Sequence, residues 1–420
     1  MTAAPGAPVA IIADDLTGAN DTAVQFTRQG WDARLVLAEL NAVELSSEAT
    51  TVFAATTDAR PMPYDDARRV TSDAAARAVE AGAERFYLKV DSTVRGSIAA
   101  QVDGALEALG GEVLAVICPA YPHMGRTLHE AVLLVGGIPV AETSLRDDPT
   151  TPVSSSDMRQ LVPGATALPR ANSADGYAAA MAAAYARGDR LVIADASTEA
   201  DLDSLARAVA TASHRVLPVG SAGLAAALAG AWERHQVPME PSSQQRVSDV
   251  DNILVQVSSL NPVSLAQLEA LRSAPGTRVT VLEPKPADFA TEQAMHEWME
   301  DHLRQVPDGV TVITAPRDRA GDARMIAEGL GEISATLLRS GAFAAAGFVG
   351  GDGAFAALRA AGCTALRVLE AIEEGIPLAI ATDGELAGML IFTKAGGFGA
   401  DTSLTQAVES MRRILKRNIA

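Results

Sequence analysis

The sequence predicts an α/β fold made of two α/β domains with mainly parallel sheets, and three observations support this. The chain has 420 residues, more than one hydrophobic core normally serves. Short apolar runs alternate with longer amphipathic stretches, which is the pattern of strands connected by helices. Residues 238–250 are polar, contain prolines and lack apolar periodicity. We therefore expect an N-terminal domain at residues 1–237, a linker at 238–250 and a C-terminal domain at 251–420.

Apolar runs in the first part of the chain predict strands at residues 9–13, 34–37, 52–55, 86–89 and 113–117. Amphipathic stretches between them predict helices at residues 21–29, 65–81 and 99–109. After Pro119 the alternation breaks. The pair Gly136-Gly137 within residues 133–140 indicates a hairpin, and residues 147–163 have the composition of a polar loop. Another helix and a strand at residues 191–194 should follow.

The C-terminal part repeats the alternation of strands and helices. Its apolar runs predict strands at residues 253–257, 278–282, 310–314, 345–349 and 390–393, with helices in most of the gaps and a last helix at 403–415.

Charge and composition exclude several classes of partner. A net charge of -18 disfavours nucleic acids and anionic membranes, because the overall field repels both. Cys118 and Cys363 lie too far apart in the sequence to suggest a disulfide framework or a zinc site. No stretch approaches the ~20 apolar residues of a membrane span, and no secretory leader is visible at the start. We expect a cytoplasmic protein that binds small molecules.

Two adjacent carboxylates follow the first predicted strand. Asp14 and Asp15 come directly after it and precede a Thr-Gly pair and a helix. Ligands of open α/β sheets bind at the carboxyl ends of strands, where such carboxylates can bind hydroxyl groups or act as a base. The structural alternative is a helix N-cap, which accounts for only one of the two.

The segment after the fourth strand, Lys89-Val90-Asp91-Ser92-Thr93-Val94-Arg95-Gly96, carries four polar residue types. Lys89 and Arg95 supply positive charge for a carboxylate, while Asp91 and Ser92 offer partners for hydroxyl groups. A strand-end ion pair is the structural alternative. Arg60, after the third strand, lies on the same rim if the sheet is parallel.

The loop after the fifth strand is stiffened by Pro119 and Pro122, which are followed by His123 and Arg126. Arg126 is a candidate for an anion, whereas a lone histidine such as His123 is more often structural than catalytic.

Three strand-end loops in the C-terminal part indicate a nucleotide site. Gly350-Gly351-Asp352-Gly353 follows the strand at 345–349 and should open a helix at about Ala354, so that backbone N–H groups can bind phosphate. Ser258 starts the loop after the strand at 253–257, and Gly396-Gly397 lies after the strand at 390–393. Neither a P-loop nor a dinucleotide-binding fingerprint is present.

Six ordered segments resemble the four-carbon acid sugar kinase family, once known only as a domain of unknown function. They are Ala-Asp-Asp-Leu-Thr-Gly-Ala at 13–19, the Lys89 segment, residues 118–127, Gly-Ser-Ala-Gly-Leu at 220–224, the Gly350 loop and Lys-Ala-Gly-Gly-Phe-Gly at 394–399. The continuation Asn20-Asp21-Thr22 is most similar to the D-threonate kinase branch. Two positions depart from the family: Gly353 stands where threonine is usual, and Val257 where glycine is usual.

The resemblance implies an ATP- and Mg²⁺-dependent kinase that phosphorylates the terminal C4 hydroxyl of a four-carbon sugar acid, with D-threonate favoured. A 3-oxo-tetronate kinase, an erythronate kinase and a non-catalytic sugar-acid-binding relative are the alternatives. It also implies an active-site cleft between the domains. The acid would contact Asp14, Arg60, Lys89, Val90, Asp91 and Ser92, with Arg126 as a further candidate. ATP would contact Ser258, Gly350, Gly351, Asp352, Gly353, Gly396 and Gly397.

The expected chemistry is in-line phosphoryl transfer, with an aspartate taking the proton of the substrate hydroxyl. Asp14, Asp15 and Asp91 are the candidate bases; Asp14 is favoured for orienting the substrate, and Asp15 and Asp91 are not ranked. Lys89 and Arg95 would fix the carboxylate or stabilise developing charge. Metal ligands and oligomeric state stay open, a homodimer included.

Two rival functions belong to other classes. A non-catalytic binding protein has no need of three carboxylates beside a phosphate loop, and it would hydrolyse no ATP. A nicotinamide-dependent oxidoreductase is disfavoured because no G-x-G-x-x-G turn follows any predicted strand.

Overall fold

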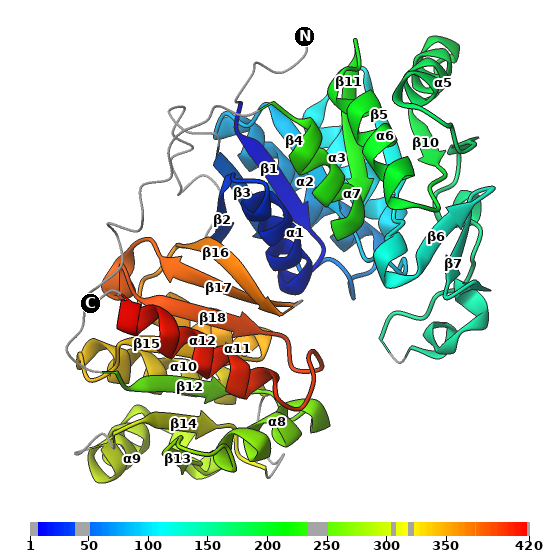
Figure 1. The fold of residues 1–420 in the computed structure, drawn as a ribbon. Coiled ribbons are helices and arrows are strands. Elements are labelled where there is room, and N and C mark those ends of the chain that lie inside the picture. The colour runs from blue at the N-terminus through cyan, green and yellow to red at the C-terminus, as the bar shows by residue number, and fades with distance from the viewer. Residues whose placement is uncertain are drawn as a thin grey trace. The chain divides into compact units, whose positions relative to one another are not determined.

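The computed structural model describes residues 7–37, 51–148, 150–233, 251–303, 308–317, 323–373 and 375–417. The chain divides into two compact units, Met1–Pro238 and Met239–Ala420 (Figure 1). The linker expected at 238–250 lies outside the described residues.

The first unit contains a parallel sheet with the strand order β2-β3-β1-β4-β11-β5-β10-β9. All the strands predicted in this part of the chain are confirmed, whereas β9 and β11 were missed. A proline inside β11, Pro218, hid its strand character. The strands are β1 Val9–Ala13, β2 Asp32–Val36, β3 Thr51–Thr56, β4 Arg85–Lys89, β5 Val113–Cys118, β9 Thr166–Leu168, β10 Leu191–Ala194 and β11 Arg215–Gly220.

Helices cover both faces of this sheet. In Figure 1, α1 and α7 lie in front of it and pack on each other, while α2 and α3 pack together behind it. The helices are α1 Leu16–Arg28, α2 Tyr64–Glu80, α3 Ile98–Leu109, α4 Met158–Leu161, α5 Ala174–Arg187, α6 Glu199–Ala210 and α7 Ala222–Ala231. The prediction that the first helix begins at residue 21 was wrong. Asp15 caps α1 by accepting the N–H of Gly18 at 2.7 Å, so the helix begins at Leu16.

Along the chain, the three strands of a separate, small antiparallel sheet come between β5 and β9 of the parallel sheet. The small sheet contains β6 Arg126–His129, β7 Val132–Val135 and β8 Ile138–Pro139. The predicted hairpin is confirmed as β7–β8, turned by Gly136 and Gly137 with φ of 58° and 83°. Strand β6 was not predicted.

The second unit contains a sheet with the order β13-β14-β12-β15-β18-β17-β16. It is parallel from β13 to β18, and β17 pairs antiparallel with both β18 and β16. Its predicted strands are confirmed, and β16 and β17 were missed. The strands are β12 Ile253–Val257, β13 Val279–Leu282, β14 Val310–Thr314, β15 Ala345–Val349, β16 Ala365–Glu373, β17 Ile376–Ala381 and β18 Leu390–Lys394.

The helices of this unit also lie on both faces of the sheet: α8 packs with α12, and α10 packs with α11. They are α8 Pro262–Arg272, α9 Glu292–Leu303, α10 Ala323–Arg339, α11 Gly351–Ala360 and α12 Ser403–Arg417. The start predicted for α11, at about Ala354, was too late. Gly351, Asp352 and Gly353 of the loop are themselves helical and form the first turn of α11, whereas Gly350 precedes the helix as its N-cap.

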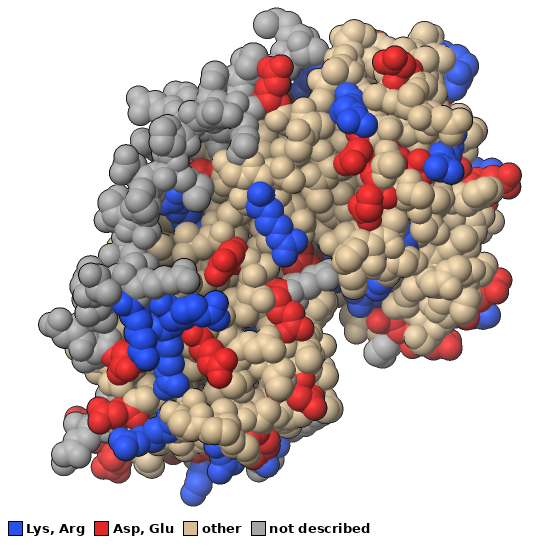
Figure 2. All heavy atoms as spheres, viewed as in Figure 1, with Lys and Arg blue, Asp and Glu red and all other residues tan. Residues whose placement is uncertain are grey.

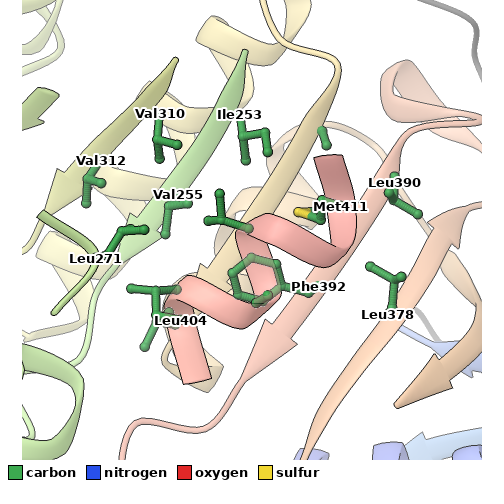
Figure 3. Packing of buried hydrophobic residues seen from close by; sticks show 14 of the residues in the cluster. Ile253, Val255, Leu271, Val310, Val312, Leu378, Leu390, Phe392, Leu404 and Met411 are labelled. Carbon is green, nitrogen blue, oxygen red and sulfur yellow. The ribbon is translucent and has the colours of Figure 1, made fainter. Parts of the chain in front are cut away.

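A hydrophobic cluster fixes the second unit on the side of α8 and α12. In Figure 3, Leu404 and Met411 of α12 lie over apolar side chains of the sheet, among them Val255 and Phe392. Alternating strand residues point to this side, because successive side chains of a strand face opposite ways. Gln256, between Val255 and Val257 in β12, therefore faces the side of α10 and α11.

The surface carries both signs of charge. Acidic and basic side chains are interspersed on the face drawn in Figure 2. Among the helices of the described residues, none combines the length and apolar character needed to cross a membrane.

Candidate active site

Charged side chains gather at the carboxyl ends of β1, β3 and β4, which are adjacent in the first unit. Asp14 and Asp15 follow β1, Arg60 follows β3, and Lys89 ends β4. Neighbouring parallel strands end at the same edge of a sheet, so the three loops meet there. We call the following residues the charged cluster: Asp14, Asp15, Arg60, Lys89, Asp91 and Arg95.

The Arg60 guanidinium connects the aspartates of this cluster. Its Nε and Nη2 donate to the two carboxylate oxygens of Asp14, at 2.9 Å each. Its Nη1 lies 2.8 Å from Asp15, and its Nη2 lies 3.9 Å from Asp91. Burial disfavours the charged guanidinium, but the bonds to Asp14 and the nearby carboxylates outweigh it and raise the pKa of Arg60. Arg60 is therefore a permanent cation at the centre of the cluster.

Asp14 and Asp15 differ in their access to a ligand. The side chain of Asp14 is fully buried, and burial raises its pKa against the opposing effects of Lys89 and Arg60. The side chain of Asp15 is 27% exposed while it caps α1 and pairs with Arg60. Asp15 is thus the carboxylate of the two that a ligand can reach directly.

Asp91 is held by strong donors. Arg95 donates to both of its carboxylate oxygens, at 2.9 and 3.0 Å, and the hydroxyl of Thr93 donates to one of them. Burial acts to raise the pKa of Asp91, but the bonds from Arg95 and the charge of Arg60 outweigh it and lower the pKa below its ordinary value. A carboxylate held in this way is a weak base, so Asp91 is suited to fixing Arg95 rather than to accepting a proton.

Lys89 lies next to the first turn of α1. A Cβ at Gly18 would be 2.6 Å from Lys89 Nζ and 2.6 Å from a carboxylate oxygen of Asp15. The lysine is 6% exposed, and no hydrogen bond or ion pair to its ammonium is found in the described part of the chain. Lys89 thus differs from the two arginines in having no bonded carboxylate among the described residues, although its charge acts on the nearby Asp14.

The turns that present the two arginines have unusual backbone geometry. Val94 has a φ of 59°, which is costly for a β-branched residue, and Asp58 has a φ of 50°. Gly96 has a φ of 83°, and a Cβ there would lie 2.7 Å from the carbonyl oxygen of Arg60. The loops of Arg60 and Arg95 therefore touch, and their contact requires a glycine.

Three further residues predicted to contact the sugar acid, Val90, Ser92 and Arg126, are not part of the charged cluster. Val90 is buried and its N–H donates to the carbonyl of Gly220 at 2.9 Å, while Ser92 is half-buried at the start of the turn. Arg126 donates to the carbonyl oxygen of Met124, and within the described ranges no hydrogen bond or ion pair joins it to the charged cluster. The strand before its loop, β5, is separated from β4 by β11, which places the loop further along the sheet edge.

Two residues of neighbouring loops have roles in shaping this edge. The backbone N–H of His123 donates to Glu199 at 2.7 Å, which supports a structural role for this turn. The carboxylate of Asp148 lies 3.9 Å from Arg95 and accepts the N–H groups of Thr150 and Thr151. Asp148 was missed because it lies in a polar loop without a motif.

In the second unit, loops meet at the carboxyl ends of β12, β15 and β18, which are adjacent. The N–H groups of Ser258 and Ser259 donate to the carbonyl of Val349 at 2.9 and 3.3 Å, and the N–H of Gly350 donates to that of Lys394 at 2.8 Å. A Cβ at Gly396 would lie 2.1 Å from Ser259 Oγ. The three predicted nucleotide loops are therefore in contact at one edge of the sheet.

The glycine loop leads directly into α11. Gly350 has a φ of 110°, and no side-chain oxygen caps the helix. The first N–H groups of a helix have no partner within the helix and, together with its dipole, attract anions. This edge of the second unit therefore suits a phosphate group.

Lys394 adds a buried positive charge beside these loops. Its ammonium donates to the carbonyls of Ala395 and Gly396 at 2.8 and 3.1 Å. Burial lowers the pKa of Lys394 to about 8, although Glu373 acts to raise it. Lys394 was not predicted as a site residue, although it begins the Lys-Ala-Gly-Gly-Phe-Gly segment; its position at the end of an apolar strand was the available signal.

The two family departures have a structural basis. A Cβ at Gly353 would lie 2.3 Å from Ser258 Oγ and 2.6 Å from Gln256 Nε2, so the first turn of α11 has no room for a threonine. Val257 is buried in the same hydrophobic cluster as Val255 and Phe392.

A metal centre built from side chains is absent from the described part of the chain. No three His, Cys, Asp or Glu side chains lie close enough together to hold a metal ion, within the residues that the structure describes. The magnesium ion of a nucleotide site is usually held by phosphates and water with only one or two carboxylates, and the exposed Asp352 is the carboxylate within the phosphate loop.

Cavity size alone does not mark the site. A cavity of about 390 Å³ lies at the amino ends of β4, β5 and β11, lined by Arg85, Val113 and Arg215 among others. This is the opposite edge of the sheet from the charged cluster.

Two family models match this chain, one in each half. A model described as a sugar-binding N-terminal domain matches residues 9–228, and one described as a nucleotide-binding C-terminal domain matches residues 254–404. The D-threonate kinase of Bordetella bronchiseptica is 36% identical over 97% of this chain and 98% of its own. The chain belongs to the four-carbon acid sugar kinase family.

Other members of the family differ in the acid that their names give. A D-erythronate kinase of Heliobacterium modesticaldum and a 3-oxo-tetronate kinase of Methylobacterium radiotolerans are similar to this chain. A solved structure from Bordetella bronchiseptica, described as a domain-swapped dimer with bound citrate, is 36% identical, covers 96% of this chain and 98% of its own, and has a TM-score of 0.50. A Haemophilus influenzae structure, at 21% identity and a TM-score of 0.74, covers 96% and 100% and shows the same fold.

Proposed function

We propose that the protein transfers the γ-phosphoryl group of ATP to the C4 hydroxyl of D-threonate. The observation that carries this proposal is the charged cluster, because it combines an ammonium without a bonded carboxylate, that of Lys89, with a partly exposed carboxylate, that of Asp15, at one sheet edge. The similarity to D-threonate kinase favours this acid over D-erythronate and 3-oxo-tetronates.

The charged cluster suits a hydroxy acid. Lys89 has no carboxylate bonded to it within the described residues and lies beside the first turn of α1, so we assign it to the substrate carboxylate. The guanidiniums of Arg60 and Arg95 are each bound to aspartates, which holds them in place without reorganisation during the reaction. Val90, Ser92 and Arg126 stay predictions as substrate contacts.

We assign proton transfer to Asp15. A general base must first be within reach of the proton that it accepts, and only then does its pKa matter. The side chain of Asp15 is partly exposed. That of Asp14 is fully buried and paired with Arg60, and that of Asp91 is paired with Arg95. In this proposal Asp14 acts by holding Arg60, and its expected role in orienting the substrate stays a prediction.

The nucleotide is assigned to the second unit. The N–H groups at the start of α11 and the ammonium of Lys394 would hold its phosphates, and the loops of Ser258 and Gly396 would flank them. A bound Mg²⁺ would offset phosphate charge. The expected cleft between the two domains stays a prediction.

Assembly and location are further proposals. Because a relative of 36% identity is described as a domain-swapped dimer, we propose a homodimer, which light scattering of the purified protein would test. We place the reaction in the cytoplasm, where ATP is supplied, and cell fractionation would test this.

The experiment that tests the function is a coupled ADP-release assay with Mg²⁺-ATP and a panel of D- and L-threonate, D- and L-erythronate and 3-oxo-tetronates. Release that requires D-threonate supports the proposal. Release with a different acid moves the protein to another branch of the family, and bound ATP without release for any acid indicates a non-catalytic relative.

A further inference from the structure

Gln256 is a fully buried polar residue in the sheet of the second unit. It is the fourth residue of β12, and neither its Nε2 nor its Oε1 is hydrogen-bonded within the described residues. Its exposed fraction is 0%, so solvent does not reach the amide. A buried amide without a partner lowers the stability of the fold, so its presence in a central strand suggests a functional role.

The amide of Gln256 lies close to the first turn of α11. Ile313 of β14 and Phe348 of β15 are its register partners on the two neighbouring strands, and both side chains are apolar. In the direction of α11, the position of a Cβ on Gly353 would be only 2.6 Å from Gln256 Nε2. The amide thus points at the first turn of α11, where the glycine has no side chain.

That first turn is also the phosphate-binding edge described above. It has no side-chain cap, and Ser258 Oγ beside it is already used as a donor to the carbonyl of Val349 at 3.0 Å. A phosphate bound by the N–H groups of this turn would lie next to Gln256, and the amide could satisfy its donor there. Two independent features, the uncapped helix and the unpartnered amide, therefore converge on one ligand group.

We propose that Gln256 is a phosphate-binding residue of the nucleotide site, donating from its side-chain amide to a phosphate oxygen held at the start of α11. This inference rests on the proposed function and adds to it a residue from the interior of β12. On this account the missing side chain of Gly353 and the presence of Gln256 belong together, because a side chain at residue 353 would occupy the place of the amide.

A second buried polar group in the same sheet provides the matched control. Thr311 of β14 is 1% exposed, and its hydroxyl also lacks a partner within the described residues. Unlike Gln256, it lies in the second position of its strand, at the end away from the phosphate loop. Replacing either residue by an apolar one of similar size removes an unsatisfied group, but only one replacement should affect the ligand.

The test uses the full chain and two measurements. Binding of Mg²⁺-ADP is measured by calorimetry, and stability without nucleotide by urea unfolding, for the wild type, Gln256→Met and Thr311→Val. We expect Gln256→Met to raise the Kd for ADP at least tenfold while its urea midpoint stays equal or rises. We expect Thr311→Val to bind ADP as the wild type does.

Each other result decides against the inference. An ADP affinity of Gln256→Met within twofold of the wild type removes Gln256 from the site. Weaker binding together with a lower urea midpoint assigns it a structural role only. A wild type that binds no ADP refutes the proposed function as well, whereas normal wild-type binding confines any failure to Gln256.

Discussion

Replacing Asp15 by asparagine separates the chemistry of its carboxylate from its structural role. Asparagine caps helices about as well as aspartate, so the bond from the Gly18 N–H, now 2.7 Å long, should remain. The lost ion pair with Arg60 is partly exposed, at 27% and 16% of the two side chains, and should cost at most about 1 kcal/mol. The fold of the variant should therefore be intact.

The effect on catalysis should be far larger. Removing a general base lowers the rate by about 10²–10⁴-fold, which corresponds to about 3–5 kcal/mol in the barrier. We expect this loss in kcat, because an amide cannot accept the hydroxyl proton.

The assay is acid-dependent ADP release at saturating ATP, with urea unfolding of the same samples. Asp175→Asn is the matched control, since Asp175 is an exposed acid in the first turn of α5 in the same unit. A folded Asp15→Asn enzyme with kcat within threefold of the wild type would show that Asp15 is not the base.

Three further predictions concern stability. Gly353→Ala should destabilise by about 1–3 kcal/mol in urea unfolding, since the added Cβ meets Ser258 Oγ at 2.3 Å; a gain, as is usual for alanine in a helix, would refute the close contact. Lys394→Met should be more stable than the wild type at pH 7. The folded protein loses this proton near pH 8 and the unfolded chain near 10.5, so wild-type stability should rise with pH between these values and that of the variant should not; equal urea midpoints at pH 7 and 9.5 in the wild type would contradict this. Asp91→Asn should lower the free energy of unfolding by about 2 kcal/mol above pH 5. The lowered pKa of Asp91 stabilises the fold above its ordinary pKa of 3.8, and this contribution disappears on acidification, so the stability of the variant should fall less than that of the wild type as the pH is lowered. An equal change in the free energy of unfolding between pH 6 and pH 3 in both proteins would contradict this.

The charged cluster was predictable because its signals are local. Asp14, Arg60 and Lys89 each follow an apolar strand, and parallel neighbouring strands bring such loops together. The order of strands was not visible in the sequence. For that reason the sequence did not show that β11 separates β4 from β5, the strand before Arg126.

The starts of α1 and α11 and the strands β11 and β17 were not predicted correctly, because residues typical of loops occur in them. Asp15 and Gly351 have the composition of loops, yet one caps α1 and the other begins α11. Prolines inside β11 and β17 concealed these strands. The environment of Gln256 depends on β14, β15 and α11 together, and no local pattern reveals it.

The measurement that tests the central claim most directly is phosphorus NMR of the product formed from D-threonate and Mg²⁺-ATP. Transfer to the C4 hydroxyl places the phosphate on a CH₂ group, so its new signal should split into a triplet that appears together with ADP. A doublet would place the phosphate on C2 or C3, and inorganic phosphate alone would show ATP hydrolysis without transfer; either result would contradict the account.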